Sequence, residues 1–159
     1  MAYRRSALEE AAYFLGARRR TEQEVRDRLA DKGYEMDETE AAMAELKAGG
    51  YIDDYEYAYV YAELSYGKRR ASGRIICELT AKGVSGETAA NAVEDYRFDN
   101  SIDERKMALE EARRLRGTMD IGDEASLRKA RGRIARRLDS AGFTSGDIIS
   151  ALDELGREE

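Results

Sequence analysis

ASGRIICELTAKGV, residues 71–84, has two counterparts elsewhere in the chain, TEQEVRDRLADKGY at residues 21–34 and ARGRIARRLDSAGF at residues 130–143. Each copy has an apolar residue eight positions before a glycine, a leucine four positions before it, and an apolar or aromatic residue directly after it. The glycines are Gly33, Gly83 and Gly142, so the copies lie 50 and 59 residues apart. A helical phrase that recurs at such a period indicates a tandem array, in which each unit relies on its neighbours to bury its apolar face.

Capping residues and glycines divide each unit into three predicted helices. In the first unit we expect helices over residues 6–19, from Thr21 to Gly33, and from Asp37 to Gly49, with capping boxes at Thr21 with Glu24 and at Asp37 with Glu40. The chain has no proline and 38% charged residues, a composition that favours helix throughout. The predicted fold is all-α, an elongated curved array of three tandem three-helix repeats at residues 1–50, 51–99 and 100–159.

Helical spacing also predicts which residues face inward. The inward stripe of the first helix is predicted to be Leu8, Ala11, Ala12 and Leu15, and that of the helix after residue 54 to be Tyr57, Val60, Tyr61 and Leu64. Tyr55, Tyr59 and Tyr66 fall outside the second stripe, so we expect some of their rings to be exposed. Such rings suit base stacking or a protein interface, and packing between neighbouring repeats is the alternative.

Several classes of function are excluded by composition. Without histidine and with one cysteine, the chain lacks the common transition-metal ligand sets and the usual general base near neutral pH. We expect no enzymatic activity, no cofactor and no metal site. Asp53 and Asp54 are interpreted as helix caps rather than as magnesium ligands. Cys77 is expected to be a small core residue, and the three repeat glycines to end helices rather than to bind phosphate.

The cellular compartment follows from the same inventory. A single cysteine excludes an internal disulfide and fits a reducing compartment. The chain shows neither a secretory leader nor an apolar run of about 18 residues. We therefore expect a cytoplasmic monomer. The net charge of −6 and the pI near 5.0 oppose coating of nucleic acid by the whole surface, so phosphate contacts would need local basic patches.

Three quoted stretches resemble the RecX family of recombination regulators. The closest is GGYIDDYEYAYVYAELSYGKRRASGRIICELTAKGVSGETAANAV at residues 49–93, and residues 17–34 and 136–152 resemble the first and third repeats of that family. The resemblance implies a regulatory protein that binds the RecA recombinase filament and inhibits filament growth, ATP hydrolysis and strand exchange. It thereby implies a role in recombination, DNA repair and the SOS response.

Cations gather at matching places in the repeats, where they are predicted to form a discontinuous basic strip that binds the RecA filament or DNA. The candidate residues are Arg18, Arg19, Arg20, Lys68, Arg69, Arg70, Arg74, Arg131, Arg133, Arg136 and Arg137, with Tyr55 and Tyr59 beside them. Guanidinium groups suit both phosphate and carboxylate partners. One alternative is a solvated helix face paired with nearby acids, and another is an independent helical module that binds nucleic acid, single-stranded DNA included.

Overall fold

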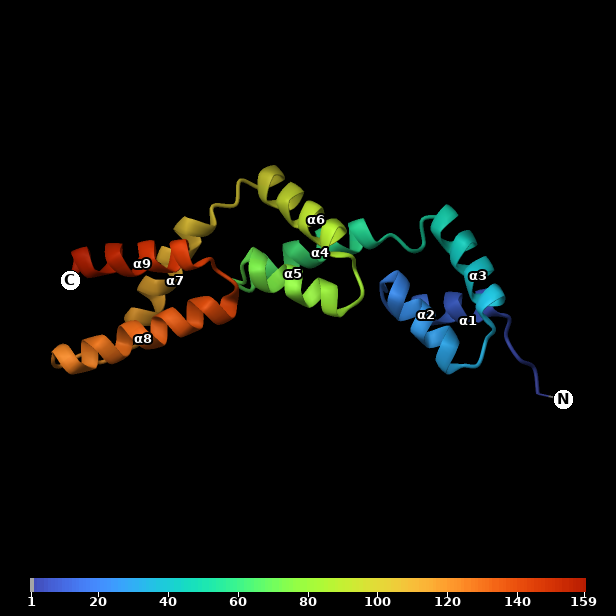
Figure 1. Ribbon diagram of the computed structural model, residues 1–159, viewed down its shortest axis with the longest axis horizontal. Coiled ribbons are helices and arrows are strands. Elements are labelled where there is room, and N and C mark those ends of the chain that lie inside the picture. Colours follow the sequence, from blue (N-terminus) through green and yellow to red (C-terminus); the bar gives the residue numbers. More distant parts are fainter. Residues whose placement is uncertain (1) are drawn as a thin grey trace.

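The computed structural model describes residues 2–159, and within them all nine regular elements are α-helices. These are α1 (Ala7–Leu15), α2 (Glu22–Asp31), α3 (Met36–Ala48), α4 (Asp54–Gly67), α5 (Ser72–Ala81), α6 (Gly86–Asp99), α7 (Glu104–Arg116), α8 (Glu124–Ala141) and α9 (Ser145–Glu158). Figure 1 shows an elongated molecule with α1–α3 at one end, α4–α6 in the middle and α7–α9 at the other end. The prediction of an elongated all-α array is confirmed.

The three signature helices, α2, α5 and α8, bury equivalent positions four residues apart. These are Thr21, Val25 and Leu29 in the first copy, Ala71, Ile75 and Leu79 in the second, and Ala130, Ile134 and Leu138 in the third. Residues at this spacing lie on one face of a helix. Around each of these faces the described residues form a separate buried cluster, and the N-terminal residue Ala71 of the second copy joins the cluster of the third. The repeated phrase is therefore the part of each unit that its core surrounds.

Two predicted inward faces were partly wrong. On α1, Leu8 is 36% exposed, whereas Ala7 and Glu10 are buried beside Ala11. On α4, Leu64 is 61% exposed, and the buried residues are Ala58, Ala62, Ser65 and Tyr66. Alanine and serine allow α4 to lie close to α6, since the distance between packed helices depends on the side chains at the contact. Small residues rather than the largest apolar ones therefore mark the inward face here.

Helix boundaries agree with the capping pattern at most ends. The Thr21 hydroxyl accepts a hydrogen bond from the Glu24 amide at 3.1 Å, but the Glu24 carboxylate pairs with Arg18 at 3.7 Å instead of returning to the cap. Helix α3 begins at Met36, ahead of the expected start, where Glu38 accepts a hydrogen bond from the Glu35 amide at 3.0 Å. The start differs because a capping box forms around Glu35, with Glu38, instead of around the predicted Asp37.

The signature helices follow one another end to end along the molecule (Figure 1). At the junction of the second and third repeats, the Ala71 amide donates to the Ala141 carbonyl at 2.7 Å and the Gly73 amide to the Gly142 carbonyl at 3.1 Å. At the junction of the first and second repeats, the Thr21 hydroxyl donates to the carbonyl that follows α5, at 2.7 Å. Unpaired groups at the start of one helix thus meet unpaired carbonyls at the end of another, and the two helix dipoles lie head to tail.

A pair of adjacent acids adds a further hydrogen bond at each of the same junctions. Asp53 and Asp103 cap their own helices, α4 and α7. The next residue in each pair reaches back to the preceding repeat, because Asp54 accepts from the first amide of α2 at 2.9 Å and Glu104 from the first amide of α5 at 2.7 Å. The interpretation of Asp53 and Asp54 as caps is confirmed, and one acid of each pair also joins two repeats.

Candidate partner-binding surface

The link between α4 and α5 lies beside the end of α8 and one side of α7, where it forms a hollow rich in cations. Six cations line it: Lys68, Arg69, Arg70, Arg74, Arg114 and Arg137. We call this set the cationic junction. Glu111 is the one carboxylate among the lining residues within the described chain. The second group of predicted cations and part of the third are therefore brought together in space.

Few acids neutralise the cationic junction. Glu78 pairs with both Arg74, at 2.7 Å, and Arg70, at 3.6 Å. Glu111 pairs with Arg114 at 2.6 Å and more distantly with Arg69 at 3.9 Å. Lys68 and Arg137 have no ion-pair partner among residues 2–159. The cations of these ion pairs are partly exposed, although Glu111 is largely buried, and surface ion pairs contribute little to folding. The junction therefore carries surplus positive charge that suits an anionic ligand.

The remaining candidates on α8 divide by the side of the helix on which they lie. Arg131 turns toward α9, where it donates to the Leu152 carbonyl at 3.0 Å, so its role is structural. Arg133 and Arg136 are exposed and have no ion-pair partner in the described part of the chain. Arg133 stands four residues before Arg137, so it lies on the same face of α8 and extends the cationic surface along it, whereas Arg136 directly precedes Arg137 and points to a different side of the helix.

Arg18, Arg19 and Arg20 lie at the other junction, between the first and second repeats. Arg19 pairs with Glu56 of α4 at 2.8 Å. The guanidinium carbon of Arg20 lies 4.0 Å from the centroid of the Phe14 ring, a favourable cation–π geometry. Arg20 thus packs within the first repeat, and Arg19 reaches the second repeat through an exposed ion pair that contributes little to folding. The first group of arginines does not join the cationic junction.

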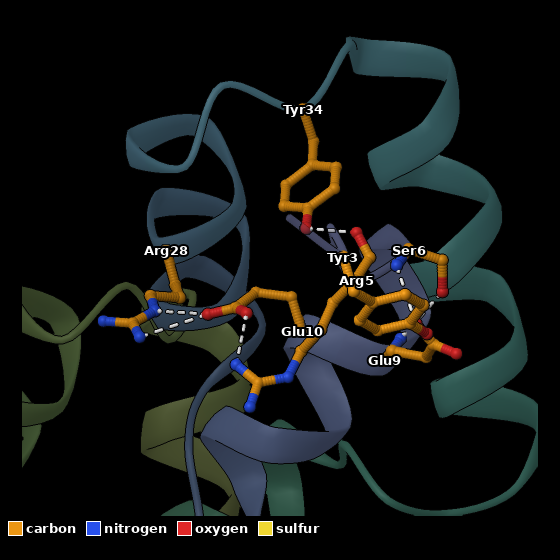
Figure 2. A network of polar contacts seen from close by, with 7 residues as sticks. All are labelled: Tyr3, Arg5, Ser6, Glu9, Glu10, Arg28 and Tyr34. Carbon is orange, nitrogen blue, oxygen red and sulfur yellow. Dashed lines mark hydrogen bonds and ion pairs between the residues drawn. The ribbon is translucent and has the colours of Figure 1, made fainter. Parts of the chain in front are cut away.

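An internal ion pair also occupies Arg28, another arginine of the first signature helix. Figure 2 shows the carboxylate of Glu10 between Arg5 and Arg28. The ion pairs measure 3.3 Å to Arg5 and 3.1 Å to Arg28, and Glu10 is only 5% exposed. Burial disfavours the charged carboxylate, but the hydrogen bonds from the two arginines outweigh it and lower the pKa of Glu10. This arginine stabilises α1 against α2.

The tyrosines of α4 are not the free platforms that their spacing predicted. The Tyr55 hydroxyl donates to Asp95 and the Tyr59 hydroxyl donates to Asp99 at 2.8 Å, both on α6. The Tyr66 ring is 7% exposed and its hydroxyl donates to Glu104. The expectation that some of these rings are exposed is correct for Tyr55, which is 41% exposed. It is wrong for Tyr66, because the true inward face of α4, turned toward α6, buries that ring.

Acidic partners change the titration of these tyrosines. Burial and a hydrogen bond donated to Glu78 raise the pKa of Tyr61 to about 12. The hydrogen bond to Asp95 is the first cause for Tyr55, whose pKa also rises to about 12. In both cases the neutral phenol is favoured, because it donates to a carboxylate that a phenolate would repel.

These pKa shifts predict alkaline destabilisation of the fold. A native pKa above the unfolded value of 10.0 means that the native state holds the proton more tightly, so this stabilisation is complete below pH 10 and is lost as the pH rises toward about 12. We expect tyrosinate absorbance to appear at a higher pH in native protein than in protein unfolded by urea. The Tyr61→Phe variant should have one fewer tyrosine that titrates at this higher pH. Coincident titration of native and unfolded protein would contradict this expectation.

Two features of this surface had no signal in the sequence. Arg114 and Glu111 reach the cationic junction because α7 lies beside the α4–α5 link, an approach that no local pattern indicates. Cys77 was expected in the core and is exposed instead. It stands two residues after the buried Ile75, which places it on the opposite side of α5.

No group of metal-ligating side chains occurs within residues 2–159, and none of the helices there has the length and apolar character of a membrane span.

Comparisons with known proteins agree with this architecture. Residues 7–46 match the model of the first three-helix domain of RecX. A regulatory protein RecX from Amycolatopsis mediterranei is 29% identical over 146 residues, which cover 91% of this chain and 82% of that relative. Another, from Geobacillus sp., is 30% identical over 94% of this chain, which spans 55% of that longer relative. The crystal structure of RecX from Lactobacillus salivarius has the same fold, with a TM-score of 0.77 at 22% identity over 95% of both chains.

Proposed function

Because the chain belongs to the RecX family, we propose that it binds the RecA recombinase filament and inhibits filament growth, ATP hydrolysis and strand exchange. Its place of action is the cytoplasm, where it modulates recombination, DNA repair and the SOS response. The observation that carries the proposal is the cationic junction, a cluster of six cations on an elongated array. An array of this shape contacts successive subunits of a filament and so hinders their rearrangement without catalysis.

The surface that we assign to the filament differs from the strip expected along the whole array. We propose Lys68, Arg69, Arg70, Arg74 and Arg137 as its centre, with Arg133 as its extension along α8. The arginines of the first repeat, together with Arg131, Tyr55 and Tyr59, act within the fold instead. Planar guanidinium groups bind carboxylates and phosphates with two hydrogen bonds each, so the surface suits acidic loops of a protein or filament-bound DNA.

Charge reversal tests this proposal. We expect the protein to lower RecA-dependent ATP hydrolysis on single-stranded DNA at substoichiometric amounts. Reversal of Arg69, Arg70 and Arg74 to glutamate should raise the concentration for half-inhibition roughly tenfold, since each exposed contact contributes about 0.5 kcal/mol. The matched control reverses Arg105, Lys106 and Arg128, cations of the third repeat outside the cationic junction, and should change little.

Two outcomes would count against the proposal. Unchanged hydrolysis at equimolar protein would remove its basis, and equal effects of the two triple reversals would remove the cationic junction from it. A second candidate, an independent nucleic-acid-binding module, is favoured by the same surplus charge. Tight DNA binding without RecA that weakens steeply with added salt would support that candidate instead.

A further inference from the structure

A second hollow adjoins the cationic junction and has a different chemistry. Its walls contain Tyr66, Met107, Glu110 and Phe143. Three further lining residues, Arg69, Glu111 and Arg114, also line the cationic junction. The two hollows therefore adjoin at these shared residues, and we call them together the junction groove. One half of this groove is cationic, and the other has an apolar floor.

The floor of the second hollow is made by side chains that belong to the core. Tyr66 is 7% exposed and Phe143 4% exposed, and Met107 is partly buried beside them. Only a small part of each ring reaches the open hollow, beside the more exposed Met107, and Arg69 and Arg114 line both this hollow and the cationic junction. A ligand that fills the groove would thus need an apolar group beside an anionic one.

Arg69 has an unusual backbone for its residue type. Its φ of +60° is left-handed, the conformation that ends α4, where the Arg69 amide donates to the Tyr66 carbonyl at 2.9 Å and the Arg70 amide to the Ser65 carbonyl at 3.1 Å. Four other positive-φ positions hold glycine: Gly33, Gly50, Gly83 and Gly142. A side chain in this conformation is strained. Because Arg69 is exposed and its ion pair with Glu111 is long, the fold itself gains little from this arginine.

We propose that the junction groove binds an acidic peptide segment that carries a large apolar side chain next to its carboxylates. The apolar side chain lies in the second hollow, the carboxylates bind the cationic junction, and Arg69 contacts a carboxylate at the boundary between them. This inference rests on the proposed function, because the partner there is a protein filament, and it adds the chemistry of the segment that is recognised.

The groove suits a peptide better than a nucleic acid. Base stacking needs an exposed aromatic face, whereas Tyr66 already stacks on Tyr96, with ring centroids 5.6 Å apart, and Phe143 is buried. Glu110 and Glu111 in the wall of the groove repel phosphates and carboxylates alike. A peptide backbone can donate hydrogen bonds to these two acids, whereas a phosphodiester backbone has no donor.

Fluorescence anisotropy with the full chain tests the ligand class. The probe is a labelled peptide of aspartates and glutamates around one phenylalanine, compared with the same peptide carrying alanine in its place and with a labelled oligothymidylate. We expect the phenylalanine peptide to bind about tenfold more tightly than the alanine peptide, since a buried aromatic side chain contributes this much or more. Equal binding of the two peptides, or displacement of the peptide by oligothymidylate, would overturn the proposal.

A pair of glycine substitutions separates binding from folding. Arg69→Gly removes both the side chain and the strain, so we expect about tenfold weaker peptide binding together with a thermal midpoint about 2–4 °C higher. Ser101→Gly is the matched control, because Ser101 is the other non-glycine residue with positive φ in residues 2–159, at +53°, and it lies outside the groove. It should raise the midpoint similarly and leave binding unchanged.

The outcomes also distinguish this inference from the proposed function. Unchanged peptide binding by Arg69→Gly would remove Arg69 from the site. Inhibition of RecA-dependent hydrolysis without peptide binding would overturn the groove ligand and leave the proposed function intact. Peptide binding without any effect on hydrolysis would overturn the proposed function and leave the groove ligand intact.

Discussion

Replacing Gly142 by alanine is expected to lower the free energy of unfolding by about 3 kcal/mol. Gly142 has a φ of +96°, and a β-carbon there would lie against the Arg74 amide, 2.7 Å from the Arg74 β-carbon and 2.9 Å from the Ala71 carbonyl oxygen. The helix ends must therefore separate, which breaks the two backbone hydrogen bonds that join α5 to α8. Urea unfolding followed by circular dichroism measures the loss.

The other repeat glycines provide graded controls. Gly33 has a similar φ of +80°, but its nearest neighbour would be 3.9 Å away, so Gly33→Ala tests the backbone conformation alone and should cost about 1 kcal/mol. Gly83→Ala should lie between the two, because its β-carbon would meet Gln23, whose γ-carbon would lie 2.8 Å away. Equal losses in the three variants would show that close contact between repeats contributes nothing at these positions.

These glycines also show how much of the fold could be predicted from the sequence. Their spacing identified three repeats and the ends of the signature helices, because helix termination is a local property. Their second role, the close approach of the next helix at Gly83 and Gly142, depends on how whole repeats are placed. The same limit explains α4, where periodicity selected Leu64 as buried but packing against α6 buries Ala58 and Ala62 instead.

The candidate surface was predictable to a similar extent. Lys68, Arg69, Arg70 and Arg74 are close in sequence, so their proximity in space followed from the chain itself. The addition of Arg137 and Arg114 required the contact between α5 and α8 and the position of α7. Arg19 was predicted to bind a partner molecule but pairs within the protein, and its partner Glu56 lies in another repeat and cannot be identified from sequence spacing.

A second large effect is expected from Glu104→Ala, which should lower the free energy of unfolding by about 4 kcal/mol. Glu104 is 3% exposed and accepts hydrogen bonds from the Tyr66 hydroxyl at 2.7 Å, from the Ser72 amide at 2.7 Å and from the Ser72 hydroxyl at 2.9 Å. Alanine would leave these donors without an acceptor in the interior. Because Ala71 has no side chain that can cap α5, the start of that helix depends on Glu104 and on the carbonyls at the end of α8.

Asp54→Ala is the matched comparison, because Asp54 occupies the equivalent place at the junction of the first and second repeats. It accepts one hydrogen bond, from the Glu22 amide, at a less buried position, and burial raises its pKa, so the carboxylate is less favoured there. We expect its loss to cost about 1 kcal/mol, as for an ordinary helix cap. If Glu104→Ala were no more destabilising than Asp54→Ala in the same urea titration, the second and third repeats would not depend on a buried acid. The head-to-tail contact of α5 with α8 would then hold that junction by itself.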